Sequence, residues 1–324
     1  MKINALGSKL ANISTALRSW GLLVLALWMA TSAQGQFNNE WIDYSKTYYK
    51  IKVGDEGIFR LSKTVLDAAG IGGSDAAHFQ LWINGTQIPL YTSVASGVLP
   101  ANGFIEFYGE KNNGSLDRSL YRSTADYLPG NNSLFTDTAI YFLTVNTVGA
   151  NLRYQPVVNN LSNLPAAAPN IWKRLRHNYI NAGTQRPYVN RGLGINFGET
   201  VYSSSFERGE MLSSGDIFPN QNNNDNSNRD AQYANLLPYT QGSLNVKVRT
   251  CIAGAAQRNR TVRVSLGGTT IYDRFFATYE ARIDSATNVS PALLQGSPFI
   301  QISNLNTDVT DRVVAGFTEI EYPR

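Results

Sequence analysis

Apolar and polar residues alternate in short runs along most of this chain, and this alternation restricts its fold more than any other feature. In SLNVKVRTCI (residues 243–252), one face of an extended strand gathers Leu244, Val246, Val248, Thr250 and Ile252. The other face gathers Asn245, Lys247, Arg249 and Cys251. Several such runs, separated by glycine-rich turns, indicate strands that bury one face and expose the other, as a β-sandwich requires.

The region up to residue 158 contains signals for two hairpins. Alternating runs at 47–53 and 58–62 flank the turn sequence GDEG. Runs at 79–83 and 88–94 flank Asn84-Gly85, a pair that suits a type I′ turn. We therefore predict two hairpins within a mostly β region.

One short helix is predicted in this first region. Ser62 can cap the segment KTVLDAAG, and Gly70 supplies a left-handed stop. Val65, Leu66 and Ala69 would share its buried face. The fold class is therefore mainly β, with two sandwich-like domains and one short helix in the first.

Four segments follow from these patterns. Residues 1–35 form a signal peptide, 36–158 an N-terminal β domain, 159–170 a linker rich in proline and alanine, and 171–324 a second β-sandwich-like domain. The run IWKRLRHNYI (residues 171–180) fits a strand, but its apolar residues also fit a helix.

The first 35 residues have the features of a secretory signal peptide. Three basic residues lead into WGLLVLALWMA (residues 20–30), which is short for a membrane span. Ala33 and Gly35 suit a signal-peptidase site. We expect export of residues 36–324 to the periplasm, the cell surface or the medium, with no membrane span after cleavage. A retained anchor is the alternative.

Charge and cysteine content argue against a nucleic-acid-binding protein and against a fold held by disulfides. The formal net charge is +4, and losing the three basic residues of the leader lowers it to +1. A nearly neutral exported chain has no electrostatic basis for binding nucleic acid. Cys251 is the only cysteine, so no intramolecular disulfide can form.

Nucleophilic catalysis requires an activated nucleophile, a base and a group that orients the base. Cys251 lies within a predicted strand, not at a helix start where a thiolate is stabilised, and the bases available are His78 and His177. The chain has no G-x-S-x-G elbow, H-E-x-x-H pair or phosphate-binding loop, and no two acids stand out as a glycosidase pair. We predict that this chain is not an enzyme; a Cys251–His177 dyad is the alternative.

GFIEFYGEKNNGSLDRSLY (residues 103–121) is a candidate metal loop. Its oxygen donors and glycine are Glu110, Asn112, Gly114 and Asp117, but their spacing departs from that of an EF-hand loop. Asparagine, aspartate and glycine are also ordinary turn residues. We expect the stretch to turn a corner, with no metal or cofactor bound.

A second candidate for calcium lies in NQNNNDNSNRD (residues 220–230). This segment has nothing apolar to bury, so we expect a mobile loop. The alternative is a calcium site, because flexible oxygen donors suit a hard cation. Its ligands would be Asn224, Asp225, Asn228 and Asp230.

Aromatic side chains on the surface could stack on sugars. The candidates are Trp82, Trp172, Tyr179 and Tyr188. Core packing is the usual role of a tryptophan in an alternating strand such as FQLWI. Carbohydrate binding by a free-standing secreted or adhesion protein therefore stays an alternative function.

Four blocks in a fixed order resemble one family: YYKIKVGDEGIFRLSKTVLDAAGI, FQLWINGTQIPLY, FIEFYGEKNNGSLDRSLY and LFTDTAIYFLTV. They are similar to the N-terminal non-catalytic region of gingipain-like cysteine peptidases and of the type IX secretion sortase of Bacteroidetes. VNRGLGINFGE and FTEIEYPR are similar to segments that precede the catalytic domain in that family. The resemblance covers about residues 41–324.

The resemblance implies a role beside a peptidase. In the family, the catalytic cysteine and histidine lie in a downstream caspase-like domain, and Cys251 does not match that nucleophile. We expect the chain to be a piece of a longer protein whose β module supports or shields the peptidase or sortase domain. That domain is the implied partner, together with cell-surface or secretion-system proteins.

Overall fold

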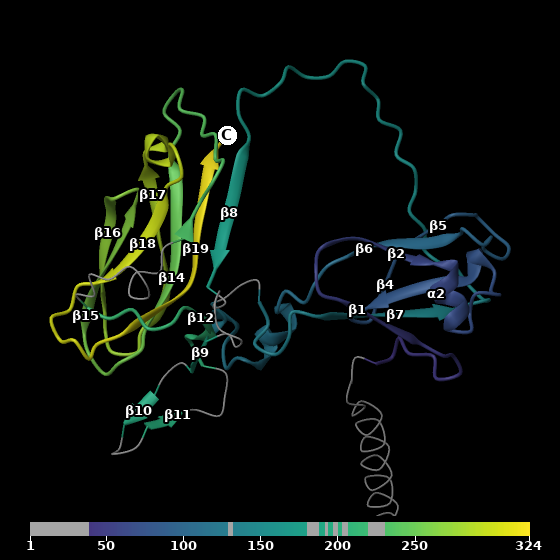
Figure 1. Ribbon diagram of the computed structural model, residues 1–324, viewed down its shortest axis with the longest axis horizontal. Coiled ribbons are helices and arrows are strands. Elements are labelled where there is room, and N and C mark those ends of the chain that lie inside the picture. Colours follow the sequence, from purple (N-terminus) through teal and green to yellow (C-terminus); the bar gives the residue numbers. More distant parts are fainter. Residues whose placement is uncertain are drawn as a thin grey trace, which may run out of the picture. The chain divides into compact units, whose positions relative to one another are not determined.

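The computed structural model describes residues 39–128, 132–179, 188–191, 194–196, 200–202, 207–219 and 231–324. These residues are mainly β (Figure 1). They divide into two compact units, each discontinuous in sequence. The first contains 39–51, 58–107 and 140–155, and the second contains 52–57, 108–139 and the residues from 156 onward. The predicted signal peptide lies outside the described residues.

Two sheets form the scaffold of the first unit. One has the order β1-β7-β3-β4 and the other β2-β6-β5. The first sheet consists of β1 (Tyr49–Val53), β7 (Ala139–Val145), β3 (Phe79–Ile83) and β4 (Thr86–Ile88). The second consists of β2 (Gly57–Ser62), β6 (Phe104–Gly109) and β5 (Tyr91–Thr92). Phe107 of β6 packs against Tyr141 of β7 with ring centroids 5.3 Å apart, so aromatic side chains fill the space between the sheets.

One predicted hairpin is confirmed and the other is wrong. β3 and β4 pair with Ile83 opposite Thr86, and Asn84 and Gly85 have φ values of 48° and 79°, as a type I′ turn requires. β1 and β2 instead belong to different sheets. The GDEG connection therefore carries the chain from one sheet to the other. The local alternation of residues does not distinguish such a connection from a hairpin turn.

The predicted helix is present as α2 (Lys63–Ala68), the one α-helix among the described residues. The Ser62 hydroxyl accepts a hydrogen bond from the Val65 N–H, and Gly70 has a φ of 77°. Leu66 is buried, but Val65 is 52% exposed. The expected three-residue face is therefore wrong, because this short helix packs through Leu66. The 3-10 turn Ala76–His78 leads into β3.

The second unit contains two four-stranded sheets (Figure 1). One has the order β17-β14-β19-β8, formed by β17 (Ala281–Val289), β14 (Val246–Gly254), β19 (Val313–Pro323) and β8 (Trp172–Asn178). The other has the order β13-β18-β15-β16, formed by β13 (Ala231–Gln232), β18 (Phe299–Asn304), β15 (Arg260–Leu266) and β16 (Thr269–Phe276). Two short two-stranded antiparallel sheets pair β9 (Tyr188–Arg191) with β12 (Glu210–Ser213), and β10 (Gly194–Asn196) with β11 (Thr200–Tyr202). Short 3-10 turns occupy Ser115–Leu120, Thr124–Asp126 and Pro291–Leu294.

The core between these two sheets uses the predicted apolar face of β14. Val246, Val248 and Ile252 are all buried in one cluster with residues of β15 and β18. The Thr250 hydroxyl shares a hydrogen bond of 2.7 Å with the Tyr272 hydroxyl of the opposite sheet. This bond satisfies two buried hydroxyl groups between the two layers.

Two strand assignments were settled by pairing. Residues 172–178 form β8 along β19, so the helical alternative for 171–180 is wrong. β17 has the sequence ARIDSATNV, a stretch for which the sequence predicts no strand. Apolar and polar residues do not alternate regularly along it, and its pairing with β14 defines it as an edge strand.

The opposite face of β14 and β19 is also buried, which corrects the expectation of one exposed face. Cys251 and Phe317 lie there in a cluster with Met211 of β12 and Leu128. Leu128 comes from residues 108–139, which the sequence analysis placed in the N-terminal domain and which belong to the second unit. Local patterning cannot assign this cover, because it depends on contacts between residues far apart in sequence.

No helix in the described part of the chain combines the length and apolar character needed to span a membrane.

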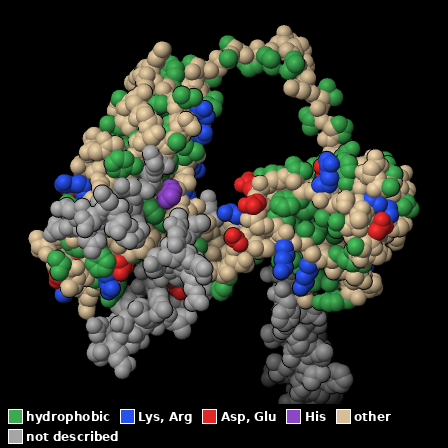
Figure 2. Space-filling view, viewed as in Figure 1, with side chains coloured by type: hydrophobic (Ala, Val, Ile, Leu, Met, Phe, Trp, Pro, Cys, Tyr) green, Lys and Arg blue, Asp and Glu red, His purple; other side chains and the backbone are tan. Residues whose placement is uncertain are grey.

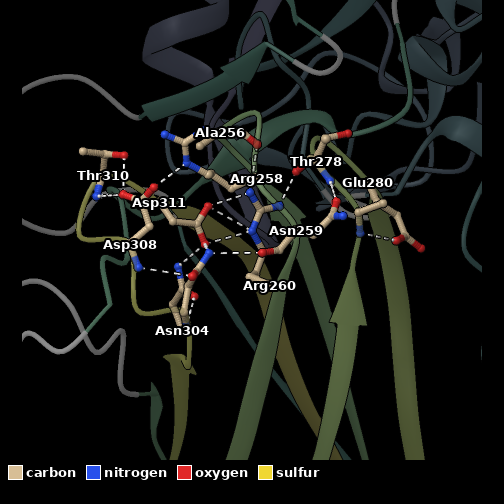
Figure 3. Close-up of polar contacts among 12 residues, drawn as sticks. Ala256, Arg258, Asn259, Arg260, Thr278, Glu280, Asn304, Asp308, Thr310 and Asp311 are labelled. Atoms are coloured by element: carbon tan, nitrogen blue, oxygen red, sulfur yellow. Dashed lines mark hydrogen bonds and ion pairs between the residues drawn. The ribbon is translucent and has the colours of Figure 1, made fainter.

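A buried ion pair joins the loops at one end of the sandwich (Figure 3). The Arg260 and Asp311 side chains are both 0% exposed, and Arg260 Nη2 lies 2.6 Å from Asp311 Oδ1. Asn304 and Asn306 each donate to Asp311 Oδ2 at 3.0 Å, and Arg260 also donates to the Ala256 carbonyl at 2.8 Å. Burial opposes ionisation of Asp311, but the hydrogen bonds from Arg260, Asn304 and Asn306 outweigh it and hold its pKa below the usual value.

We expect Arg260→Ala to lower the free energy of unfolding by about 3–5 kcal/mol, because it leaves the Asp311 carboxylate buried without its partner. Arg263→Ala, on the same strand, is the matched control. The side chains of Arg263 and of its partner Asp273 are both about 40% exposed. Loss of this ion pair should therefore lower the free energy of unfolding by at most about 1 kcal/mol. Urea denaturation measures both; equal effects would contradict the structural role of Arg260.

Candidate functional site

Cys251 lies inside a packed cluster and does not line an open site. Its side chain is 0% exposed, and its Sγ lies 3.5 Å from Met211 Sδ. Burial raises the pKa of the thiol to about 12, although three nearby arginines oppose this rise. The thiolate that nucleophilic catalysis requires is therefore disfavoured at this position.

A bulge in β19 makes this packing possible. Cys251 pairs with Phe317 and Ile252 pairs with Ala315, so Gly316 has no partner on β14. A Cβ at Gly316 would lie 2.7 Å from Met211 Sδ and 3.3 Å from Cys251 Sγ. Only glycine leaves room for the two sulfur atoms here.

His177 and Cys251 lie on opposite faces of the same sheet. His177 pairs with Thr318, and Cys251 pairs with Phe317, the neighbouring residue of β19. Directly paired residues share a face and successive residues alternate, so the sheet separates the imidazole from the thiol. The His177 ring packs against Tyr179 instead, and burial lowers the pKa of His177.

His177 does not complete a dyad with Cys251, because the sheet lies between the two side chains. His78 belongs to the first unit, where it ends the 3-10 turn before β3. The structure therefore does not bring together the residues of the alternative Cys251–His177 site.

The stretch 103–121 turns a corner by using its own polar side chains. Asp117 is buried and accepts from the Leu134 N–H at 2.9 Å and from the Ser133 hydroxyl at 3.2 Å. Asn112 donates to the Thr136 carbonyl at 2.9 Å. These bonds join residues 112–117 to residues 133–136 and explain the polar residues of this stretch as loop contacts.

Gly114 is required at this corner for two reasons. Its φ is 73°, and a Cβ would lie 2.3 Å from the Asn132 carbonyl oxygen. The Asn112 side chain accepts a hydrogen bond from the Gly114 N–H at 3.0 Å. Among the described residues, no group of three or more histidine, cysteine or acidic side chains could hold a metal ion.

The same corner borders a cavity of about 380 Å³. Its polar wall includes Lys111, Asn112 and Asp137, and its apolar part includes Phe135 and Leu212 of β12. The Phe135 side chain is 68% exposed. The cavity therefore combines an accessible aromatic ring with ammonium, amide and carboxylate groups, which is the chemistry of a polar ligand site.

The other predicted functional residues are scattered. Trp82 is stacked on Trp41 with ring centroids 5.3 Å apart, and Tyr179 is 6% exposed. Trp172 is 54% exposed on β8. The side chain of Tyr188 and the whole Asn-rich segment 220–230 lie outside the described structure.

A buried carboxylate that the sequence did not single out lies on the face that Cys251 occupies. Glu319 is 1% exposed and binds Arg176 at 2.8 Å and Arg249 at 2.9 Å. Burial would raise its pKa, but the two arginines outweigh it and keep the pKa below its usual value. The alternation in FTEIEY indicates that Glu319 and Phe317 share a face. The arginine partners of Glu319 come from two other strands, which the alternation does not identify.

The sequence matches no protein-family model. No curated protein matches it either. Among solved structures, it is similar to dimeric latent PorU from Porphyromonas gingivalis, with a TM-score of 0.48 and 14% identity. That similarity covers 86% of this chain and 24% of the PorU chain, so this chain spans about a quarter of its length.

Two carbohydrate-binding modules are similar over part of the chain. One is the CBM36-1 domain of a multidomain xylanase from the hindgut metagenome of Trinervitermes trinervoides, with a TM-score of 0.27, 11% identity, and coverage of 46% of this chain and 96% of that chain. The other is a CBM36 module in complex with calcium and xylotriose, with a TM-score of 0.27, 13% identity, and coverage of 45% and 98%. Scores at these levels do not establish a common fold.

We expect thiol reagents to label Cys251 in native buffer on the order of a thousandfold more slowly than in denaturant. Access requires opening of the cluster around Met211 and Phe317, which costs most of a global stability of about 5 kcal/mol or more. Absorbance with an aromatic disulfide reagent follows the reaction, and Cys251→Ala gives the background. Rapid labelling of the folded chain would contradict the burial of the thiol.

Proposed function

We propose that this chain is an exported, non-catalytic β module that supports or shields a gingipain-like cysteine peptidase or sortase domain of the same protein. The observation that carries the proposal is the position of Cys251. This thiol is sealed in a cluster, has a raised pKa and is separated from His177 by the sheet. The order of the four family-like sequence blocks supplies the identity of the partner domain.

The arrangement of the second unit suits a supporting role. Its two sheets enclose a continuous apolar core, and ion pairs such as Arg260–Asp311 are internal. What the described surface offers a partner is strand edges and loops. A rigid module of this kind positions a neighbouring domain without taking part in its chemistry.

The purified chain should not hydrolyse fluorogenic arginyl, lysyl or mixed peptide substrates, and Cys251→Ala should be indistinguishable from the wild type. Activity that disappears in Cys251→Ala would refute the non-catalytic assignment. The nucleotide sequence after codon 324 tests the second half of the proposal. A continuing frame that encodes a histidine and a cysteine of a peptidase domain supports it, whereas an immediate stop codon contradicts it.

A second candidate function is glycan binding at the cavity beside residues 111–112 and 132–137. It is favoured by the 68% exposed Phe135 next to Lys111 and Asp137, because an aromatic ring can cover the apolar face of a sugar while charged groups bond its hydroxyls.

A glycan array with the purified chain tests this second function. If it holds, Phe135→Ala should weaken saturable binding about tenfold or more, in line with the loss of a stacking aromatic. Phe275→Ala is the control, because Phe275 is 58% exposed on β16 and does not line the cavity. Absence of saturable binding to any glycan would remove this function.

A further inference from the structure

Strand β8 forms one edge of its sheet, and the backbone groups on its outer side have no strand beside them among the described residues. On its inner side, Ile171 and Arg324 exchange both backbone hydrogen bonds, at 2.8 and 2.7 Å, and the Tyr179 N–H donates to the Gly316 carbonyl at 3.0 Å. In an antiparallel pair these bonds use every second residue. The backbone N–H and C=O groups of residues 173, 175 and 177 therefore also point toward β19. Those of Trp172 and Arg174 point to the open edge.

Basic side chains outnumber carboxylates on one face of β8 and of the two strands next to it. On the face that carries Glu319 and Glu321, the flanking strands β8 and β14 contribute four basic side chains: Arg174, Arg176, Lys247 and Arg249. Two carboxylates thus meet four cations, and the Arg174 side chain stays 61% exposed although it binds Glu321 at 2.6 Å. Figure 2 shows Lys and Arg side chains along the side of the second unit on which β8 lies.

Apolar groups stand at the start of the same strand. Ile171 is 63% exposed and Trp172 is 54% exposed. An incoming strand would find an aromatic contact at this end and cationic side chains further along. Exposed aromatic and arginine side chains are the residue types that contribute most at protein interfaces.

We propose that the open edge of β8 binds an extended acidic segment of a partner protein, which adds to the sheet as a fifth strand. Main-chain hydrogen bonds to Trp172 and Arg174 hold the segment, and its carboxylates complement the excess positive charge. A second copy of this chain is disfavoured as the occupant, because pairing β8 with β8 would set lysine and arginine side chains against one another. The proposal does not depend on the role beside a peptidase domain.

The probe is a fluorescein-labelled seven-residue peptide in which glutamate and valine alternate, titrated with the full chain and followed by anisotropy. We expect saturable binding that weakens as salt rises, because the complementary charges are screened. Hydrogen–deuterium exchange should show new protection of the Trp172 and Arg174 amides. The same peptide with lysine in place of glutamate should not bind.

Two substitutions at one position separate backbone from side-chain effects. Arg174→Pro removes an N–H that points away from β19, and proline is tolerated at such edge positions. It should weaken peptide binding about tenfold beyond Arg174→Ala, which keeps the N–H and removes the same side chain. Circular dichroism checks that both variants fold. If Arg174→Pro does not fold, the hydrogen–deuterium exchange of the wild-type chain with the peptide still tests the proposal.

Several results would overturn the proposal. They are no saturable binding of the glutamate peptide, equal binding of the lysine peptide, binding without protection at Trp172 and Arg174, or equal affinity of the two Arg174 variants. Self-association of the chain that Arg174→Pro abolishes would also overturn it, since the occupant would then be a second copy.

Discussion

The central strands β14 and β19 of the second unit are buried on both faces, and the rest of that unit is organised around this constraint. One face packs on the opposite sheet through residues such as Val248 and Ile320. The other face carries Cys251 and Phe317 and needs a cover of its own, which Met211 and Leu128 provide. Because Leu128 belongs to residues 108–139, the second unit recruits a segment that lies in sequence between two strands of the first.

Burial on both faces also explains where charges occur inside the unit. Glu319 stands on a covered face, where an unpaired carboxylate would be costly, and it is neutralised by Arg176 and Arg249 on the two flanking strands. Arg260 and Asp311 meet the same requirement at the loop end of the sandwich. The partners of Glu319 come from the two strands that flank β19, so these ion pairs also join neighbouring strands. Asp311 precedes β19 and joins a loop to the start of β15.

The same packing decides which chemically reactive or charged groups of the second unit are open to solvent. A thiol held between Met211 and a glycine bulge is inaccessible to a substrate, whatever its intrinsic nucleophilicity. The edge strand β8 and the cavity beside Asn112 are instead open to solvent and carry charged and aromatic side chains.

The sequence by itself determined the features that depend on neighbouring residues: the strand alternation of β14, the turn at Asn84-Gly85 and the capping of α2 by Ser62. Each follows from local backbone geometry or side-chain period, so no distant contact is needed. Tertiary structure alone decided that β1 and β2 enter different sheets, that residues 172–178 are extended and that the face of Cys251 is covered. The physical reason is that strand pairing and burial are made between segments far apart in the chain, and an alternating pattern does not specify which partner or cover a strand will meet.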